Sequence, residues 1–409
     1  MKRIVCIGLG LVLLLGTTVS ATDTRVLTMG NNNLILEDQA NIFLFPSTIN
    51  RHAKLVVGEF GRYDDSEWDV NGITFTDLGI HWQLGDDNPI ILGTYFANSE
   101  RQLYWPFTLL DDESYLPSNQ RIDLFGGTRL GDVPVGLRVK LVQSSWRDDN
   151  SSKDELSFSD FSVRAGVSAP DEKWDLAGGI SLISFKDVQT SWQDETAWDR
   201  TKPEGNFQMH FGGRYFAGMQ PEYTIVPHLV VFLSKYEYGN YYWNSSAERS
   251  ELTSTEKINV FAFDVGSGFH WRPGSRVLVV LDVGVLRHQW DEEIVDAEPN
   301  SPEDKVETVR WARPYFKAGF EGHVFKWMDV RFGATSYWDK VTWETTYGTD
   351  VSEFLANYAD NTTYLGFSFH WNSLRIDTYT DPQLFLDGLN FISGRSNDMN
   401  FMISALYEL

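Results

Sequence analysis

The pattern that decides the fold lies in residues 120–145, which read QRIDLFGGTRL, then GD, then VPVGLRVKLVQSS. In both long runs charged residues occupy alternate positions, beginning with Arg121 and Asp123 and continuing with Arg138 and Lys140. Apolar residues fill the positions between them, and this period of two is the signature of a β-strand with two different faces. The letters GD between the runs form a two-residue turn. The stretch therefore predicts an antiparallel hairpin with one charged face and one apolar face.

The rest of the chain repeats this unit, with links that alternate between short turns and long polar loops. We expect about sixteen strands, each boundary uncertain by two to four residues. The expected strands are residues 52–60, 73–84, 89–98, 120–131, 133–146, 156–169, 173–187, 207–218, 222–236, 257–272, 275–290, 308–324, 326–343, 361–371, 373–380 and 398–409.

An even number of antiparallel strands with tight turns on one side and long loops on the other is typical of a bacterial outer-membrane barrel. The expected fold is therefore all-β, a transmembrane antiparallel up-and-down β-barrel located in the bacterial outer membrane. In such a barrel the charged faces line the lumen and the apolar faces meet lipid. Aromatic residues make up 14% of the chain, which suits the aromatic girdles of a membrane protein.

The two ends of the chain carry separate signals. Residues 1–21 have a basic start, an apolar centre and a small-residue cleavage site, so we interpret them as a signal peptide that contains Cys6, the only cysteine. At the other end Phe401, Tyr407 and Leu409 form an alternating terminal strand similar to the signal that barrel-assembly machinery reads. Leu409 stands where that signal usually has an aromatic residue.

Residues 22–51 do not alternate, and we expect them to form a compact periplasmic segment that plugs the barrel of residues 52–409. Arg25, Met29-Gly30, Asp38 and Pro46 resemble the opening of the FadL-type fatty-acid transporters and their PorV-like relatives. The resemblance implies a plugged barrel and a transport or secretion-accessory function. Known members of that family have fourteen strands, so a count of fourteen stands as the alternative to sixteen.

The charge of the chain limits its partners. A net charge of −23 argues against nucleic acid, and the acidic residues are concentrated in the long loops. The expected partners are outer-membrane lipid and lipopolysaccharide, the barrel-assembly machinery and a small solute. The histidines and acidic pairs lack the spacing of metal ligands, so the sequence predicts no cofactor and no metal.

The candidate functional residues are the charged side chains expected inside the barrel. They can line an ion-selective pore, or they can pair with one another and fill a plugged lumen. The leading hypothesis is a porin or FadL-like passive transporter of a small hydrophobic or anionic solute. A non-transporting barrel that serves as a secretion accessory or structural anchor is the alternative, and an outer-membrane enzyme comes third. The predicted lumen residues are Arg121, Asp123, Arg129, Arg138, Lys140, Arg214, Arg313, Lys317, Glu321, Arg331, Arg375 and Asp377.

Overall fold

A computed structural model describes the chain in twelve segments. The described residues are 22–63, 73–86, 89–97, 120–147, 155–190, 198–203, 206–220, 222–244, 249–296, 304–347, 350–380 and 401–409. The predicted signal peptide lies outside them.

The described chain forms one antiparallel sheet whose strands follow one another in sequence order. The strands are β1 (Leu55–Tyr63), β2 (Ile73–Leu84), β3 (Ile90–Ala97), β4 (Gln120–Leu130), β5 (Val133–Arg147), β6 (Glu155–Ser168), β7 (Trp174–Thr190), β8 (Trp198–Pro203), β9 (Phe207–Tyr215), β10 (Ala217–Gln220), β11 (Tyr223–Asn244), β12 (Arg249–Trp271), β13 (Val277–Asp296), β14 (Asp304–Phe325), β15 (Met328–Tyr347), β16 (Asp350–Trp371), β17 (Leu374–Thr380) and β18 (Phe401–Glu408).

The eighteen strands occupy sixteen positions, because β8, β9 and β10 lie end to end and all pair with β11. β1 pairs with β18 as well as with β2, and this seam closes the sheet into a barrel. The prediction of an up-and-down barrel with sixteen strands is confirmed, and the alternative count of fourteen is wrong. Closure leaves no sheet edge at the seam, so the backbone groups there are satisfied without water.

The burial pattern of the barrel is the reverse of that of a soluble protein. Arg121, Asp123 and Arg331 are at most 2% exposed, whereas large apolar side chains such as Leu124 and Phe332 are about half exposed. Exposed apolar residues recur on the outer face of nearly every strand, over far more area than a soluble monomer tolerates. The apolar outside therefore faces lipid, and the protein is an outer-membrane barrel.

Aromatic rings form a belt beside the short turns. The rings of Phe325, Trp327, Phe369 and Trp371 stack in succession, with centroids 5.4 to 6.2 Å apart. Such rings settle at the headgroup level of a membrane. The belt marks one membrane boundary at the end of the barrel where the chain turns tightly.

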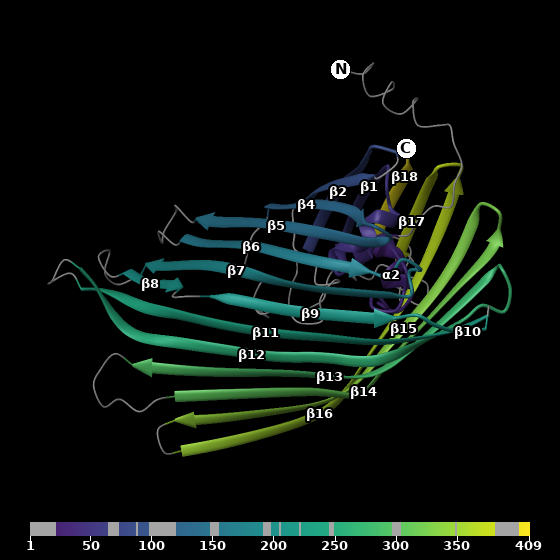
Figure 1. The fold of residues 1–409 in the computed structure, drawn as a ribbon. Coiled ribbons are helices and arrows are strands. Elements are labelled where there is room, and N and C mark those ends of the chain that lie inside the picture. Colours follow the sequence, from purple (N-terminus) through teal and green to yellow (C-terminus); the bar gives the residue numbers. More distant parts are fainter. Residues whose placement is uncertain are drawn as a thin grey trace, which may run out of the picture.

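The wall is much taller on one side than on the other (Figure 1). β11 to β16 have 20 to 23 residues each, whereas β3, β17 and β18 have seven or eight. The predictions for these six strands are too short at their long-loop ends, namely 222–236, 257–272, 275–290, 308–324, 326–343 and 361–371. A span of the bilayer needs only about 9–11 residues, so the tall strands extend well beyond the hydrocarbon region.

The N-terminal segment lies inside the ring of strands, at the end of the barrel where the short turns and the C-terminus lie (Figure 1). It consists of α2 (Asp23–Thr28), η1 (Gln39–Phe43) and η2 (Pro46–Arg51). Nearly all of its residues are buried, and its apolar side chains share one hydrophobic core with lumen-facing residues of the wall. We call residues 22–51 the plug.

No helix among the described residues is long and apolar enough to cross a membrane.

Candidate functional site

The interior of the barrel brings together most of the charged residues that the sequence places there. Eight of the twelve are buried inside, namely Arg121, Asp123, Arg138, Lys140, Arg214, Arg331, Arg375 and Asp377. Lys317 and Glu321 are partly buried and contact the plug. Arg129 is exposed at the end of β4, and Arg313 is also exposed.

Arg313 departs from the expected alternation because β14 is irregular. The register of β14 shifts between Ala312 and Tyr315, both of which are fully buried. Pro314 lies in this interval and has no N–H to give to a ladder, which is why proline occurs in sheets at such irregular positions. The guanidinium of Arg313 consequently lies 5.4 Å from the centre of the outward-facing Trp311 ring. The prediction that Arg313 lines the lumen is wrong.

A chain of ion pairs joins α2 to the wall. Arg25 donates two hydrogen bonds to the carboxylate of Glu321, at 2.8 and 3.0 Å, and Glu321 also accepts one from Arg331 at 2.6 Å. Arg331 and Arg375 both donate to Asp377, at 2.8 and 3.0 Å. Charged hydrogen bonds of this kind are the stronger ones in proteins, and breaking one inside leaves a buried charge behind. The plug is thus tied to β14, β15 and β17.

Asp38 ties two parts of the plug together. Its carboxylate lies 3.2 Å from Arg25, and it caps η1 by accepting from the backbone of Ala40 while Asn41 Oδ1 accepts from the N–H of Asp38 itself. Burial raises the pKa of the Asp38 carboxyl to about 6, against the opposite effect of Arg25. Burial lowers the pKa of Arg25, but Glu321 and Asp38 outweigh it and hold that pKa above its usual value.

Arg214 holds the plug backbone through several contacts at once. Its guanidinium donates to the carbonyls of Leu34 and Leu36, at 3.3 and 2.6 Å, and to Asn41 Oδ1 at 3.0 Å. Asp175 holds it from the wall at 2.8 Å. The Phe45 ring covers it at 4.7 Å, within cation–π range. A single lumen arginine therefore satisfies three acceptors of a segment that has little regular structure.

The carbonyl of Phe43 is held in a similar way from β5 and β6. Arg138 and Arg164 donate to it at 3.1 and 2.5 Å, and Arg138 lies 5.0 Å from the Phe43 ring. Asp123 accepts from Arg138 at 2.7 Å and pairs with Arg121 at 2.8 Å. Arg164 is absent from the predicted lumen residues, although it alternates with outward positions of β6 and the same rule could have identified it.

Glycines allow the plug backbone to lie directly against the wall. Gly30 has a φ of +79°, and a Cβ there would collide with the carbonyl oxygen of Ala318. A Cβ on Gly333 would collide with the backbone N of Gly30. A Cβ on Gly136 would likewise collide with the carbonyl oxygen of Pro46, and one on Gly166 would be in tight contact with the Pro46 ring. A Cβ on Gly319 would collide with the carbonyl oxygen of Met29, so the predicted plug residues Met29, Gly30 and Pro46 are contact points with the barrel wall.

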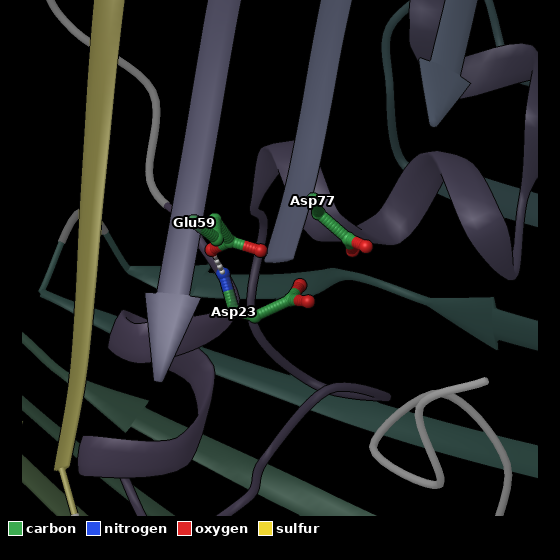
Figure 2. Close-up of side chains that lie close together, drawn as sticks. All are labelled: Asp23, Glu59 and Asp77. Atoms are coloured by element: carbon green, nitrogen blue, oxygen red, sulfur yellow. Dashed lines mark hydrogen bonds between the residues drawn. The ribbon is translucent and has the colours of Figure 1, made fainter. Parts of the chain in front are cut away.

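Three carboxylates converge where α2 meets the first two strands (Figure 2). Asp23, Glu59 and Asp77 have ligand oxygens within 4.8 Å of one another, the one such group among the described residues. Glu59 accepts from the backbone N–H of Asp23 at 3.1 Å and from Ser404 at 2.7 Å, while Asp77 accepts from Arg121 at 3.2 Å. Carboxylate oxygens suit a hard cation. These contacts already give Glu59 and Asp77 protein partners, so we assign the group to plug attachment.

Two further clusters were not predicted from the sequence. On the wall of β11 to β14, Tyr315 donates to Asp264 at 2.7 Å and contacts His228 at 3.0 Å. At the short-turn rim, Asp329 joins His323 and His370, the latter at 2.8 Å. Among the described residues the rim contacts join one carboxylate to two imidazoles, whereas a serine-type catalytic triad also has a hydroxyl hydrogen-bonded to the imidazole.

The predicted assembly signal lies in β18. Met402, Ser404 and Leu406 are buried, so Phe401, Ile403 and Tyr407 lie on the outward face. The Phe401 ring lies 5.8 Å from that of Phe60 on β1. Leu409 is exposed, and its backbone N–H donates to the carbonyl of Lys54 at 2.8 Å. Recognition by the assembly machinery stays a prediction.

No protein-family model matches the chain, and no curated protein sequence is similar to it. Among solved structures, the ferric citrate transporter FecA is 8% identical with a TM-score of 0.39, over 80% of this chain and 65% of that one. The chain thus spans less than two thirds of the FecA structure. The CymD monoaromatic hydrocarbon channel is 8% identical with a TM-score of 0.36, over 95% of this chain and 98% of that one. The ferric-catecholate receptor Fiu of E. coli K12 has a TM-score of 0.36 at 8% identity, over 87% and 81%. Similarity this low carries no functional argument, and the FadL and PorV resemblance stays a prediction.

Proposed function

We propose that the protein is a gated passive transporter of the outer membrane, closed at rest by the plug. The observation that carries this proposal is the way the plug is held. Among the described residues the plug pairs with no strand of the barrel, and its contacts with the wall are side-chain hydrogen bonds, ion pairs and apolar packing. The plug can therefore shift without breaking any ladder of the wall. Larger barrels enclose ligand cavities or channels, so a displaced plug leaves a path for a solute.

The interior favours a small hydrophobic solute over an anionic one. The lumen arginines nearest the plug are paired with carboxylates or backbone carbonyls, so little positive charge is left to attract an anion. Higher in the barrel, the lumen-facing side chains of β11 to β13 include the apolar Phe232, Ile258, Val260 and Leu286 beside polar ones such as Ser234. These residues belong to the same apolar cluster as the plug core. Movement of the plug would therefore uncover an apolar surface.

A reversible lock tests the proposal. Thr24 of the plug and Ser404 of β18 have their Oγ atoms in contact, and so do Ser47 of the plug and Ser168 of β6, at 2.7 Å. Replacing either pair by cysteines places two thiols face to face in a chain whose only native cysteine is Cys6. We expect oxidation to abolish channel openings in planar bilayers and reductant to restore them. The two locks act at opposite ends of the plug, so they also report which end moves.

Single-cysteine variants treated in the same way are the matched controls. If the reduced, oxidised and control proteins conduct equally, the plug does not control the path and the proposal fails. An open state that strongly prefers chloride over potassium would instead assign an anionic solute.

The second candidate is the non-transporting barrel, a secretion accessory or anchor. It is favoured by the dense pairing of buried charge around Arg25, Arg138 and Arg214, which suits a permanent filling as well as a movable one. This function predicts silent bilayers even for the reduced cysteine variants and for a variant in which plug contacts have been removed.

A further inference from the structure

The outward face of the tall wall changes abruptly from apolar to cationic. We define this face as the one opposite the buried Asp282, Ala312 and Asp339. Read upward from the short turns, the outward positions of β13 are Val277, Val279, Leu281, Val283, Val285 and then Arg287. Those of β15 are Met328, Val330, Phe332, Ala334, Ser336, Trp338 and then Lys340.

The cations at this boundary converge on one indole ring. Trp311 of β14 is directly opposite Arg287 on one side and Lys340 on the other. The guanidinium of Arg287 lies 5.1 Å from the centre of the Trp311 ring, and that of Arg313 lies 5.4 Å from it. The irregularity of β14 that displaces Arg313 from the lumen thus adds a third positive charge to this group. We call Arg287, Trp311, Arg313 and Lys340 the outer basic patch.

The cations of the outer basic patch lack the carboxylate partners that the buried lumen arginines have. In the part of the chain that the structure describes, Arg287, Arg313 and Lys340 form no ion pair. Arg287 donates from Nη2 to Gln289, but its buried Nε has no hydrogen-bond acceptor. Lumen arginines such as Arg214 and Arg331 have carboxylate partners at 2.8 Å or less. The net charge of the chain is −23, yet these cations beside the Trp311 ring have no carboxylate partner. We infer that their anionic partner belongs to another molecule.

The height of the outer basic patch above the short turns indicates where in the membrane its anionic partner lies. Met328 and Lys340 are the first and last outward positions of this part of β15. The strand rises about 3.3 Å per residue and tilts by about 40°, so Lys340 stands about 30 Å above the aromatic belt at the short turns. The apolar band of an outer-membrane barrel is about 25 Å tall. The cations therefore lie just above the hydrocarbon region, at the level of the headgroups of the outer leaflet.

We propose that the outer basic patch binds the phosphate groups of a phosphorylated lipid in the outer leaflet, with Arg287, Arg313 and Lys340 as the phosphate ligands. Arginine presents a planar fork that suits a phosphate oxygen pair, and lysine adds a mobile point charge. Trp311 holds both guanidinium groups in place and packs against the upper acyl chain region. Generic snorkelling cations would be spread around the barrel, whereas these three surround a single ring.

Lipid binding to the folded barrel tests this proposal. The purified protein in neutral detergent is titrated with diphosphoryl lipid A and the bound lipid is counted by native mass spectrometry. Each cation near an anionic membrane contributes about 1 kcal/mol, which is about fivefold in affinity. We therefore expect the triple variant Arg287→Gln/Arg313→Gln/Lys340→Gln to bind lipid A about 100-fold more weakly. The matched control is Arg272→Gln/Arg276→Gln/Lys326→Gln, which removes the same charge at the short turns.

Several outcomes would overturn the proposal. The triple variant could bind lipid A as tightly as the native chain, or the control could lose as much affinity. Inorganic phosphate at millimolar concentration could displace the lipid fully, which would make the patch a site for free phosphate. A comparison that needs no variant guards against misfolding, because the native chain must bind diphosphoryl lipid A more tightly than the same lipid without phosphates. Equal binding of the two lipids refutes the proposal on its own.

Discussion

Replacement of Arg214 by methionine should release the plug while leaving the barrel closed. The change removes the donor for the carbonyls of Leu34 and Leu36 and for Asn41 Oδ1. Asn41 Oδ1 keeps the N–H of Asp38 as a donor, so two buried carbonyls are left without one. Each costs about 1–3 kcal/mol, so the two together cost about 2–6 kcal/mol. Part of this loss is offset, because the methionine side chain is apolar and Asp175 keeps a second partner in Arg51 at 2.9 Å. We expect a net loss of about 3 kcal/mol, which corresponds to about a 150-fold larger open fraction of the plug.

Thiol labelling measures this open fraction. Ile35 is completely buried between the plug and β12, where its side chain lies against Gly268. The thiol of an Ile35→Cys variant is therefore protected from a bulky maleimide until the plug leaves the wall. The labelling rate in the Arg214→Met background, divided by the rate in the native background, gives the change in the open fraction directly. A gel shift on heating checks in parallel that the barrel itself stays folded.

Arg129→Met is the matched control, because it makes the same chemical change at an exposed arginine. It should leave the labelling rate of the Ile35→Cys thiol unchanged. If Arg214→Met raises the rate by less than about tenfold, which is about 1.4 kcal/mol, Arg214 does not hold the plug and our account of its contacts is wrong.

Two further predictions concern the plug. Gly333→Ala should raise the labelling rate of the Ile35→Cys thiol, because the new methyl group collides with the backbone of Gly30. Gly126→Ala is the control, because its methyl group meets nothing within 4 Å. Equal labelling rates in the two variants would contradict the close contact between Gly333 and Gly30. The pKa of Asp38 is raised from 3.8 to about 6 in the folded plug. Between pH 6 and pH 4 the folded chain therefore holds a proton that the unfolded chain releases, and the free energy of unfolding should rise by up to about 3 kcal/mol as the pH falls through this range. Asp38→Asn keeps the cap of η1 and should remove this pH dependence. The measurement is the denaturant midpoint of the folded band between pH 7 and pH 4. If the midpoint of Asp38→Asn depends on pH as that of the native chain does, Asp38 is not the titrating group.

The sequence predicts the wall well because each strand alternates under one physical rule. Charged residues at every second position of β4 and β5 place Arg121 and Arg138 inside, and the structure has them there. The rule fails where the ladder is irregular. A register shift at Ala312 turns Arg313 outward, and no periodicity in the residues themselves records such a shift. The tall ends of β11 to β16 escape prediction for another reason, because strands above the membrane have polar residues on both faces and lose the alternation.

The plug is predicted only as a segment that does not alternate. Its conformation depends on partners far away in the sequence, such as Glu321 for Arg25 and Arg214 for Leu36. No local pattern specifies these contacts. The arginines that hold backbone carbonyls could be located inside the barrel from the sequence, but their targets could not be identified.

The seam between β1 and β18 has a consequence for biogenesis. α2 contacts both sides of it, because the backbone N–H of Asp23 donates to Glu59 of β1 and the hydroxyl of Thr24 contacts that of Ser404 of β18. β18 is the last strand to be made, whereas α2 precedes every strand of the barrel. The earliest described part of the chain must therefore wait for the latest before its contacts are complete. The seating of α2 is therefore complete only after β1 and β18 have come together at the seam.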